Sequence, residues 1–203
     1  MALATYSDLK TAIANYLARS DLTNVIPDFI TQAESRLNRK LRTFDMETSQ
    51  SVTMSSGVGT LPTGYLEWIS ATWTSTDSRN QDLRYVEPNS EEWRLRYRPT
   101  SDPSMFTILA SNIRLRPVSS GNITFYYYGK IATLNSTNTT NWLLTKAPDL
   151  YVNYSLAEAA IYLKDEEKKT AFLSLADAQA DRLTVEADTN KVSRRPSRMA
   201  ETT

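Results

Sequence analysis

The segment that decides the fold covers residues 141–163 and reads NWLLTKAPDLYVNYSLAEAAIYL. Its first part is a short loop that contains Trp142, and Pro148 can open a helix because the first helical turn needs no amide donor there. From Pro148 onward the apolar residues recur with helical spacing, which predicts a long core helix. We interpret Trp142, Leu143 and Leu144 as a plug that closes the helical core, since large aromatic side chains are mostly buried.

Helical spacing also marks both ends of the chain. It predicts a helix over residues 7–19, capped by Ser7, and a second over residues 25–42 with Pro27 in its first turn. A last helix is expected after Asp165, where acidic residues complement the helix dipole. The residues expected on its buried stripe are Phe172, Leu175, Ala176, Gln179, Leu183 and Ala187.

The middle of the chain, from residue 44 to about residue 134, is typical of strands, because turn-forming residues separate short β-branched and aromatic runs. One short helix is expected within it, from Asn89 to Tyr97, with Glu92 completing a capping box. The predicted strands cover residues 67–74, 106–109, 112–116 and 123–128.

Alternation along two of these strands predicts which side chains face the core. In residues 67–74 the two tryptophans, Trp68 and Trp73, fall on opposite faces of the strand. In residues 123–128 the alternation buries Phe125 and Tyr127 together. It exposes Tyr126 and Tyr128 at a sheet edge or a subunit interface.

This order of elements predicts an α+β fold. We expect a small four-helix bundle core, made of two N-terminal and two C-terminal helices, from residues 1–43 and 141–188. An antiparallel β-rich subdomain, residues 44–140, is inserted between the two helix pairs. Residues 189–203 form an extended tail, because their polar composition supplies no core and Pro196 cannot continue a helix.

The composition excludes most catalytic chemistry. The 203 residues include no histidine and no cysteine, which removes the usual general base, the thiolate nucleophile and the common ligands of transition metals. Lysine and arginine, 23 in all, balance 23 aspartates and glutamates, so no global field attracts nucleic acid. We therefore expect no enzyme, no catalytic residue, no metal and no cofactor.

The acidic runs have a structural interpretation as well. Residues 91–92 and 165–167 fit the first turns of helices, where carboxylates cap the backbone amides. The N-terminus lacks the basic region of a signal peptide, and no apolar run is long enough to cross a bilayer. These features predict a soluble protein that is made in a cytoplasm and has no membrane partner.

Four segments follow one another along the chain, and none of them is a chemical motif. They are residues 5–42, the turn LPTGYL at residues 61–66, the strand FYYY at residues 125–128, and residues 141–168. In their order and spacing they resemble the head-to-tail adaptor, or connector, proteins of tailed bacteriophages. The resemblance implies a helical core that carries a β-rich insertion, and it implies no catalysis.

The resemblance also implies partners. Such adaptors form a homo-oligomeric ring, expected here to be a dodecamer, beneath the portal protein, and they connect it to tail or nozzle proteins. The ring lines or seals the channel through which genomic DNA passes without sequence-specific binding. This protein would then be made in the bacterial host cytoplasm and reside in the virion neck, at the head–tail junction.

Two groups of residues follow as site candidates. Family members commonly extend a C-terminal segment onto the portal, which here would be residues 189–203. The portal-binding candidates in it are Arg194, Arg195, Pro196 and Arg198. Tyr126 and Tyr128 are the candidates for the interface between subunits, where tyrosine is a favoured contact residue.

Two other functions are compatible with the sequence. A nucleic-acid-binding module could use the tyrosine-rich strand and a basic cluster formed by Arg36, Arg39, Lys40 and Arg42. The same cluster would also suit the end of a helix, where cations offset the dipole. A carboxylate-based glycosidase or lysin would require two carboxylates that converge in one cleft.

Overall fold

The computed structural model describes residues 3–19, 21–74, 80–95 and 102–193. The fold is α+β, and the chain divides into two compact units. The helical unit comprises Met1–Met46 and Ile131–Thr203, and the sheet unit comprises Glu47–Lys130. Residues 131–140, which the sequence pattern assigns to the insertion, belong to the helical unit.

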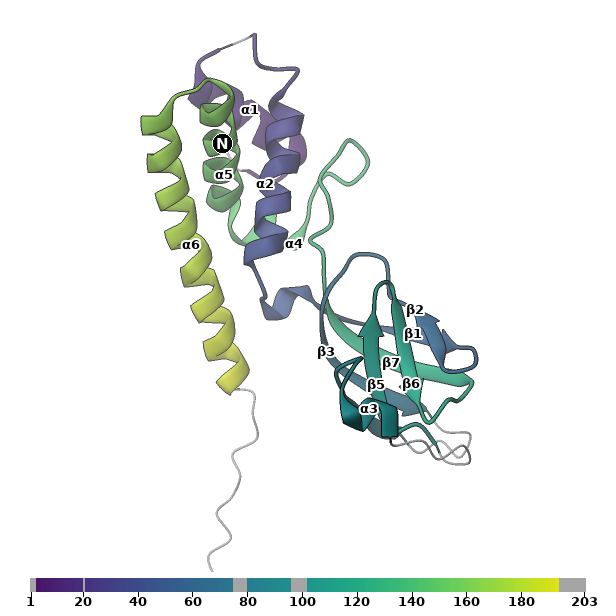
Figure 1. Ribbon diagram of the computed structural model, residues 1–203. Helices are drawn as coiled ribbons and strands as arrows, with labels where there is room; N and C mark the ends of the chain where they lie inside the picture. Colours follow the sequence, from purple (N-terminus) through teal and green to yellow (C-terminus); the bar gives the residue numbers. More distant parts are fainter. Residues whose placement is uncertain (1–2, 20, 75–79, 96–101, 194–203) are drawn as a thin grey trace, which may run out of the picture. The chain divides into compact units, whose positions relative to one another are not determined.

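The helices of the first unit are grouped around one central helix. They are α1 (Tyr6–Leu17), α2 (Ile26–Lys40), α4 (Trp142–Lys146), α5 (Pro148–Tyr162) and α6 (Glu166–Ser193), with a 3-10 turn, η1 (Phe44–Met46). Helix α5 contacts α1, α2 and α6, and Figure 1 shows it between α2 and α6. Ten of its fifteen residues are buried, as expected for a helix that is covered on several sides. These contacts define a central helix with three long neighbours, and they do not establish a regular four-helix bundle.

Helix α1 begins before its predicted cap. Thr5 and Asp8 form a capping box, in which the Thr5 Oγ1 accepts from the Asp8 amide at 3.2 Å and the Asp8 carboxylate accepts from the Thr5 amide at 3.0 Å. The predicted cap, Ser7, lies inside the helix, so that assignment was wrong. In α2, Pro27 does lie in the first turn, as predicted.

The predicted loop around Trp142 is a short helix, α4. Asn141 caps it, because its Oδ1 accepts a hydrogen bond from the Leu144 amide at 2.8 Å. Leu143 and Leu144 are fully buried, as predicted, whereas Trp142 is only half-buried. The two leucines therefore form the plug of the helical core, and the tryptophan is only partly covered.

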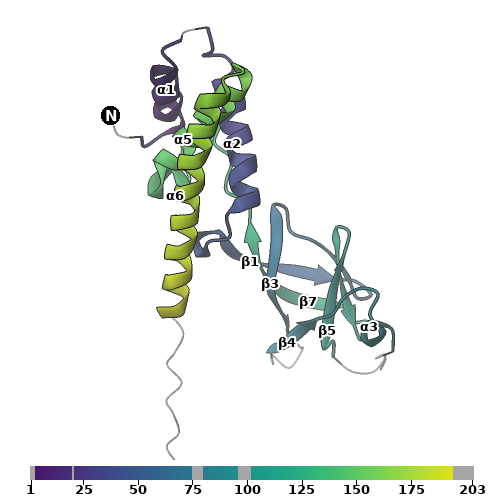
Figure 2. The same cartoon turned by 60° about the vertical axis from the view of Figure 1, so that its left-hand side comes forward.

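Helix α6 is longer than predicted, because it runs through Ser193 and takes in residues that the sequence pattern assigns to the tail. Figure 2 shows it running alongside α5 and continuing past it. Its small side chains permit close approach to its neighbours. The buried residues on this face are Ala176, Ala180, Leu183 and Ala187. Leu175, predicted to be buried, is 55% exposed, so the buried face is rotated from the predicted one.

The sheet unit is a curved, nearly closed sheet of seven strands. The strands are β1 (Glu47–Met54), β2 (Val58–Thr60), β3 (Tyr65–Thr74), β4 (Asn80–Tyr85), β5 (Met105–Leu109), β6 (Asn112–Arg116) and β7 (Gly121–Gly129). They are ordered β1-β7-β3-β4-β5-β6-β2, and a bridge between Ser55 and Val58 links the two ends.

One strand pair departs from the antiparallel sheet that the sequence predicts. Strands β4 and β5 are parallel, whereas the other pairs are antiparallel. A parallel pair needs a crossover connection, and helix α3 (Glu91–Leu95) lies in that connection. Helix α3 is capped by Ser90 rather than by Asn89, because the Trp93 amide donates to the Ser90 Oγ at 3.2 Å.

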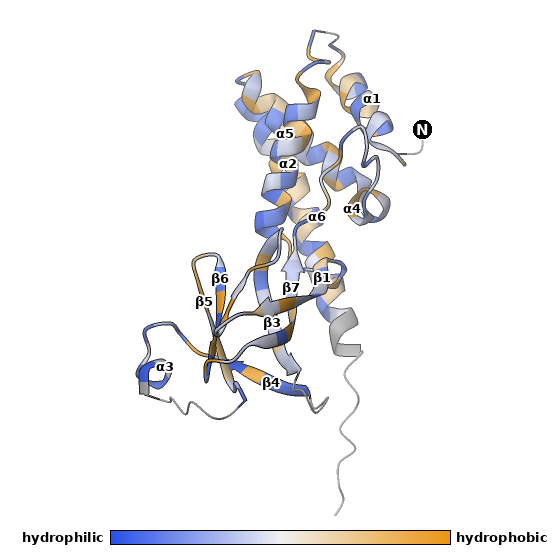
Figure 3. Ribbon diagram, turned by 90° about the vertical axis from the view of Figure 1, so that its right-hand side faces the viewer, coloured by the Kyte–Doolittle hydropathy of each residue, from blue (hydrophilic) through white to orange (hydrophobic). Residues whose placement is uncertain are grey.

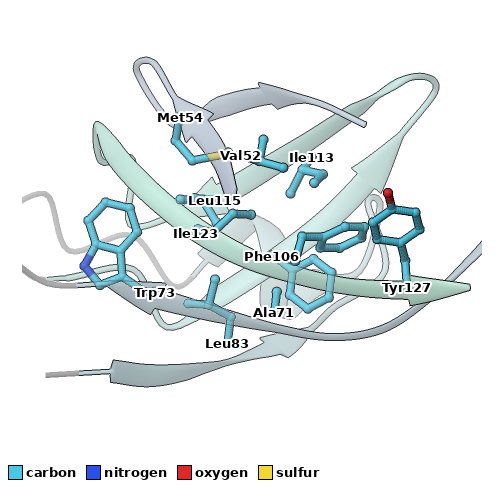
Figure 4. Close-up of a cluster of buried hydrophobic side chains, with 11 residues drawn as sticks. Val52, Met54, Ala71, Trp73, Leu83, Phe106, Ile113, Leu115, Ile123 and Tyr127 are labelled. Atoms are coloured by element: carbon cyan, nitrogen blue, oxygen red, sulfur yellow. The ribbon is translucent and has the colours of Figure 1, made fainter. Parts of the chain in front are cut away.

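Apolar side chains from six strands meet inside the sheet, and Figure 4 shows them pointing toward one another. Phe106 and Phe125 lie edge to face with their ring centroids 6.2 Å apart, a favoured aromatic geometry. The buried residues of this cluster are Val52, Met54, Ala71, Trp73, Leu83, Phe106, Ile113, Leu115, Ile123, Phe125 and Tyr127.

A bulge in β3 changes which side chains enter this core. Trp68 is paired with Tyr127 and Ser70 with Tyr126, so Ile69 is an extra residue in the ladder. The prediction that the two tryptophans face opposite sides was therefore wrong. Trp68 packs against the same core as Trp73, and the extra residue, Ile69, is left exposed.

Candidate functional site: surfaces for assembly

A buried polar cluster holds the segment that leads back into the helical unit. The Glu34 carboxylate of α2 accepts from the Leu134 amide at 2.8 Å and from the Tyr151 hydroxyl at 3.2 Å. The Asn141 amide donates to the Tyr151 hydroxyl and to the Ala132 carbonyl, both at 2.7 Å. Burial raises the pKa of Glu34 and also that of Tyr151. These groups satisfy one another, so the cluster has a structural role.

A second contact fixes the same segment one helical turn along α2. Asn38 lies four residues after Glu34, on the same face, and its Oδ1 accepts from the Ile131 amide at 2.8 Å. On α1, the Tyr6 amide donates to the Thr139 carbonyl at 2.7 Å. Helices α1, α2 and α5 therefore all position residues 131–141. Sequence reasoning missed this role, because a glutamate on a helix gives no signal that it is buried.

The basic cluster at the end of α2 serves mainly the helical unit itself. Arg36 is paired with the buried Glu158 of α5. Lys40 reaches Asp177 at 2.7 Å and Asp181 at 3.1 Å on α6, and its hydrogen bond lowers the pKa of Asp177.

The other two cations of the basic cluster, Arg42 and Arg39, have different surroundings from Arg36 and Lys40. Arg42 donates to the carbonyls of Asn38 and Leu41 at 2.9 and 2.6 Å, as expected for a cation at a helix end. Arg39 is exposed. A nucleic-acid surface built on this cluster would therefore compete with contacts that hold α2, α5 and α6 together.

The tyrosine strand has the burial that alternation predicts. Phe125 and Tyr127 are buried, Tyr126 is 42% exposed and Tyr128 is half-buried. Strand β7 is not an edge strand, because it lies between β1 and β3. Tyr126 therefore lies on the open face of the sheet, beside the bulged Ile69. They line a hollow of about 250 Å³, together with Glu47, Thr48, Ser49 and Ser70.

Helix α6 presents a second exposed apolar surface. Leu175 and Val185 are 55% and 65% exposed; Val185 lies on the face opposite to the buried alanines and Leu175 lies on the flank of the helix. A hollow of about 390 Å³ lies between α1, α5 and α6. Tyr16 is 71% exposed at its rim.

The carboxylates do not form an acid–base pair in any of four surface hollows. Three of these hollows have a single carboxylate in their lining, which is Glu47, Asp177 or Asp165, and the fourth has none. Asp165 accepts from the Lys168 amide at 3.1 Å and thereby caps α6, as predicted. Glu92 pairs with Arg84 of β4. Within the described ranges, no cluster of three or more acidic residues could hold a metal ion.

The remaining site candidates belong to the C-terminal segment. Arg194, Arg195, Pro196 and Arg198 lie outside the described residues. Among the residues that are described, no helix combines the length and the apolar character needed to cross a membrane.

Exposed apolar and aromatic side chains are thus present on both units. Over residues 4–200 the chain matches the family described as SU10 adaptor protein. It belongs to this family, a family of phage head-to-tail adaptors, which confirms the resemblance seen in the sequence. No curated protein matches the chain. Family membership indicates a structural protein of the virion neck that associates with portal and tail components.

Proposed function

We propose that this protein forms a ring beneath the portal, connects the portal to the tail, and lines or seals the channel through which DNA leaves the capsid. The family match carries the proposal, because it extends over residues 4–200 and so includes both units. As an adaptor the protein acts by binding, and it needs no catalytic residue.

Ring formation requires a suitable surface. A closed ring of identical subunits uses two different, complementary faces on each subunit. Exposed aromatic and apolar side chains on both units support this requirement. They include Tyr126 on the sheet unit and Leu175 and Val185 on the helical unit.

The portal contact is proposed for the C-terminal segment. Because α6 continues through Ser193, the segment available for the portal is residues 194–203 rather than 189–203. It contains three arginines, Arg194, Arg195 and Arg198, against a single acid, Glu201. Arginine is well suited to such contacts, because its planar guanidinium can bind a carboxylate through two parallel hydrogen bonds.

Removal of residues 194–203 tests this assignment. We expect the truncated protein to unfold at nearly the same temperature as the full chain, since the deletion leaves α6 through Ser193 complete, and to bind the purified portal less tightly. The matched control replaces Arg194, Arg195 and Arg198 by alanine and keeps the chain length. Equal portal affinity of all three proteins would refute the role of the segment. Failure of the full chain to bind portal, with no ring in electron micrographs, would refute the adaptor function itself.

The nucleic-acid alternative has a separate test. Binding through phosphate contacts weakens steeply as salt rises, because counterions are released from the nucleic acid. We expect the purified protein to bind DNA weakly and without sequence preference. Tight binding with a steep salt slope that is lost in an Arg39→Ala variant would favour the alternative.

A further inference from the structure

The two halves of the sheet carry opposite charges. Strands β1, β3 and β7 contain no lysine or arginine, and their charged residues are Glu47 and Glu67. Strands β2, β5 and β6 contain no aspartate or glutamate, and their charged residues are Arg114 and Arg116. Strand β4 lies between the two halves. Its exposed side carries one charge of each sign, Asp82 and Arg84.

The acidic half presents an outer face of the sheet, here called the tyrosine face. It consists of the outward residues of β1, β7 and β3, and most of them are serine or threonine. At its centre, the bulge places Ile69 next to Tyr126, and the two side chains are 36% and 42% exposed. The adjoining hollow of about 250 Å³ can receive a side chain from a partner. A bulge that re-aims a side chain at a surface is typical of functional positions.

The basic half presents a different face, here called the arginine face. Arg114 is exposed on β6 between Val58 of β2 and Thr107 of β5. Arg116 lies over the Trp93 ring at 4.9 Å and donates to the Arg94 carbonyl at 3.3 Å.

Helix α3 adds acids as well as arginine to this side of the unit. It contributes Glu91 and Glu92 beside Arg94, and Figure 3 shows its hydrophilic colour. Glu92 is already paired with Arg84. Arg114 is the exposed cation of the arginine face. Neither its own strand, β6, nor the neighbouring strands β5 and β2 contain a carboxylate.

We infer that the tyrosine face of one copy of this chain binds the arginine face of the next copy. The inference rests on the proposed function, because a ring needs a head-to-tail contact. Arg114 brings a cation to a face that carries Glu67 and an open aromatic ring, and both attract a guanidinium. The two faces lie on different halves of a nearly closed sheet, so one copy can use both at once, as a heterologous interface requires.

Disulfide trapping tests the pairing directly, since the chain has no cysteine of its own. Chains with Ser70→Cys, next to Tyr126, and chains with Val58→Cys, next to Arg114, keep both contact residues. They are mixed at about millimolar concentration and oxidised, with circular dichroism confirming that each is folded. The mixture should give cross-linked dimers, and a chain that carries both substitutions should give a ladder of multimers. The matched control pairs Val58→Cys with Val185→Cys, which is exposed on the other unit. That control should give few dimers.

Two results would overturn the inference. Efficient cross-linking by Ser70→Cys alone would mean that the same face meets itself. Cross-linking of the mixture no better than the control, or a wild-type chain that stays monomeric in sedimentation, would mean that the two faces have no affinity. Portal binding by the wild-type chain would persist in either case if the adaptor function holds, so the two failures are distinguishable.

Charge reversal provides an independent measurement. Arg114→Glu should weaken self-association about tenfold, because it places like charges across the contact. Mixing this variant with a Glu67→Arg chain should restore association of the mixed pair, as seen by native mass spectrometry. Absence of restoration, with both chains folded, would contradict the pairing.

Discussion

The buried hydroxyl of Tyr151 should be worth more to the helical unit than any other single hydroxyl of α5. Its O–H donates to Glu34 at 3.2 Å and its oxygen accepts from the Asn141 side-chain amide at 2.7 Å, and all three side chains are buried. Tyr151→Phe preserves the ring and removes both hydrogen bonds. Two buried polar groups then lose a partner, at about 1–3 kcal/mol each, and allowing for relaxation we expect a loss of about 2–4 kcal/mol. This is a large share of the roughly 5–15 kcal/mol that stabilises a typical domain.

Tyr154→Phe is the matched control. Tyr154 is a buried tyrosine on the same helix, but its hydroxyl makes one bond, to Asp177 at 2.7 Å. Asp177 is partly exposed and keeps its bond to Lys40, so the expected cost is about 0.5–1.5 kcal/mol. Urea unfolding followed by circular dichroism at the helical signal measures both. If Tyr151→Phe proved no more costly than Tyr154→Phe, the buried cluster would not be a principal anchor of residues 131–141.

Three further predictions address other parts of the chain. Because the folded-state pKa of Glu34 is raised, the folded protein binds more protons than the unfolded chain, and stability should fall as pH rises from the ordinary value of 4.5 through the raised one. Glu34→Gln should remove that part of the slope in urea unfolding across this range. On α6, Leu175→Ser and Val185→Ser should change stability by about 0.5 kcal/mol at most, whereas Ala180→Leu should cost about 1–3 kcal/mol by overpacking; equal midpoints would contradict the orientation of α6. In the sheet unit, a Cβ on Gly121 would lie 2.5 Å from the Trp73 ring, so Gly121→Ala should cost about 1–3 kcal/mol and alter tryptophan fluorescence.

Local pattern was a reliable guide where a side chain's surroundings depend on its own element. Apolar spacing located α1, α2 and α5 to within a few residues, and Pro27 and Pro148 marked helix starts because proline tolerates few other positions. Alternation along β7 placed Tyr126 outside and Tyr127 inside.

Local pattern was a poor guide where the answer depends on a distant partner. The bulge at Ile69 exists only in relation to the register of β7, so alternation within β3 could not reveal it and misplaced Trp68. Whether Leu175 or Ala180 faces inward depends on how α6 lies on α5, since both residues fit an apolar stripe. Arg36 and Lys40 looked like a basic patch until α5 and α6 supplied Glu158 and Asp177.

The sequence by itself therefore determined the long helices, four of the seven strands, the absence of the commonest catalytic residues and the resemblance to an adaptor family. These follow from composition, from short-range periodicity and from the order of segments. Only the tertiary structure decided that Glu34 is a buried anchor, that β4 and β5 run parallel, and that acidic and basic strands occupy opposite halves of one sheet. Each of these depends on contacts between residues far apart in the chain, and no local pattern contains that information.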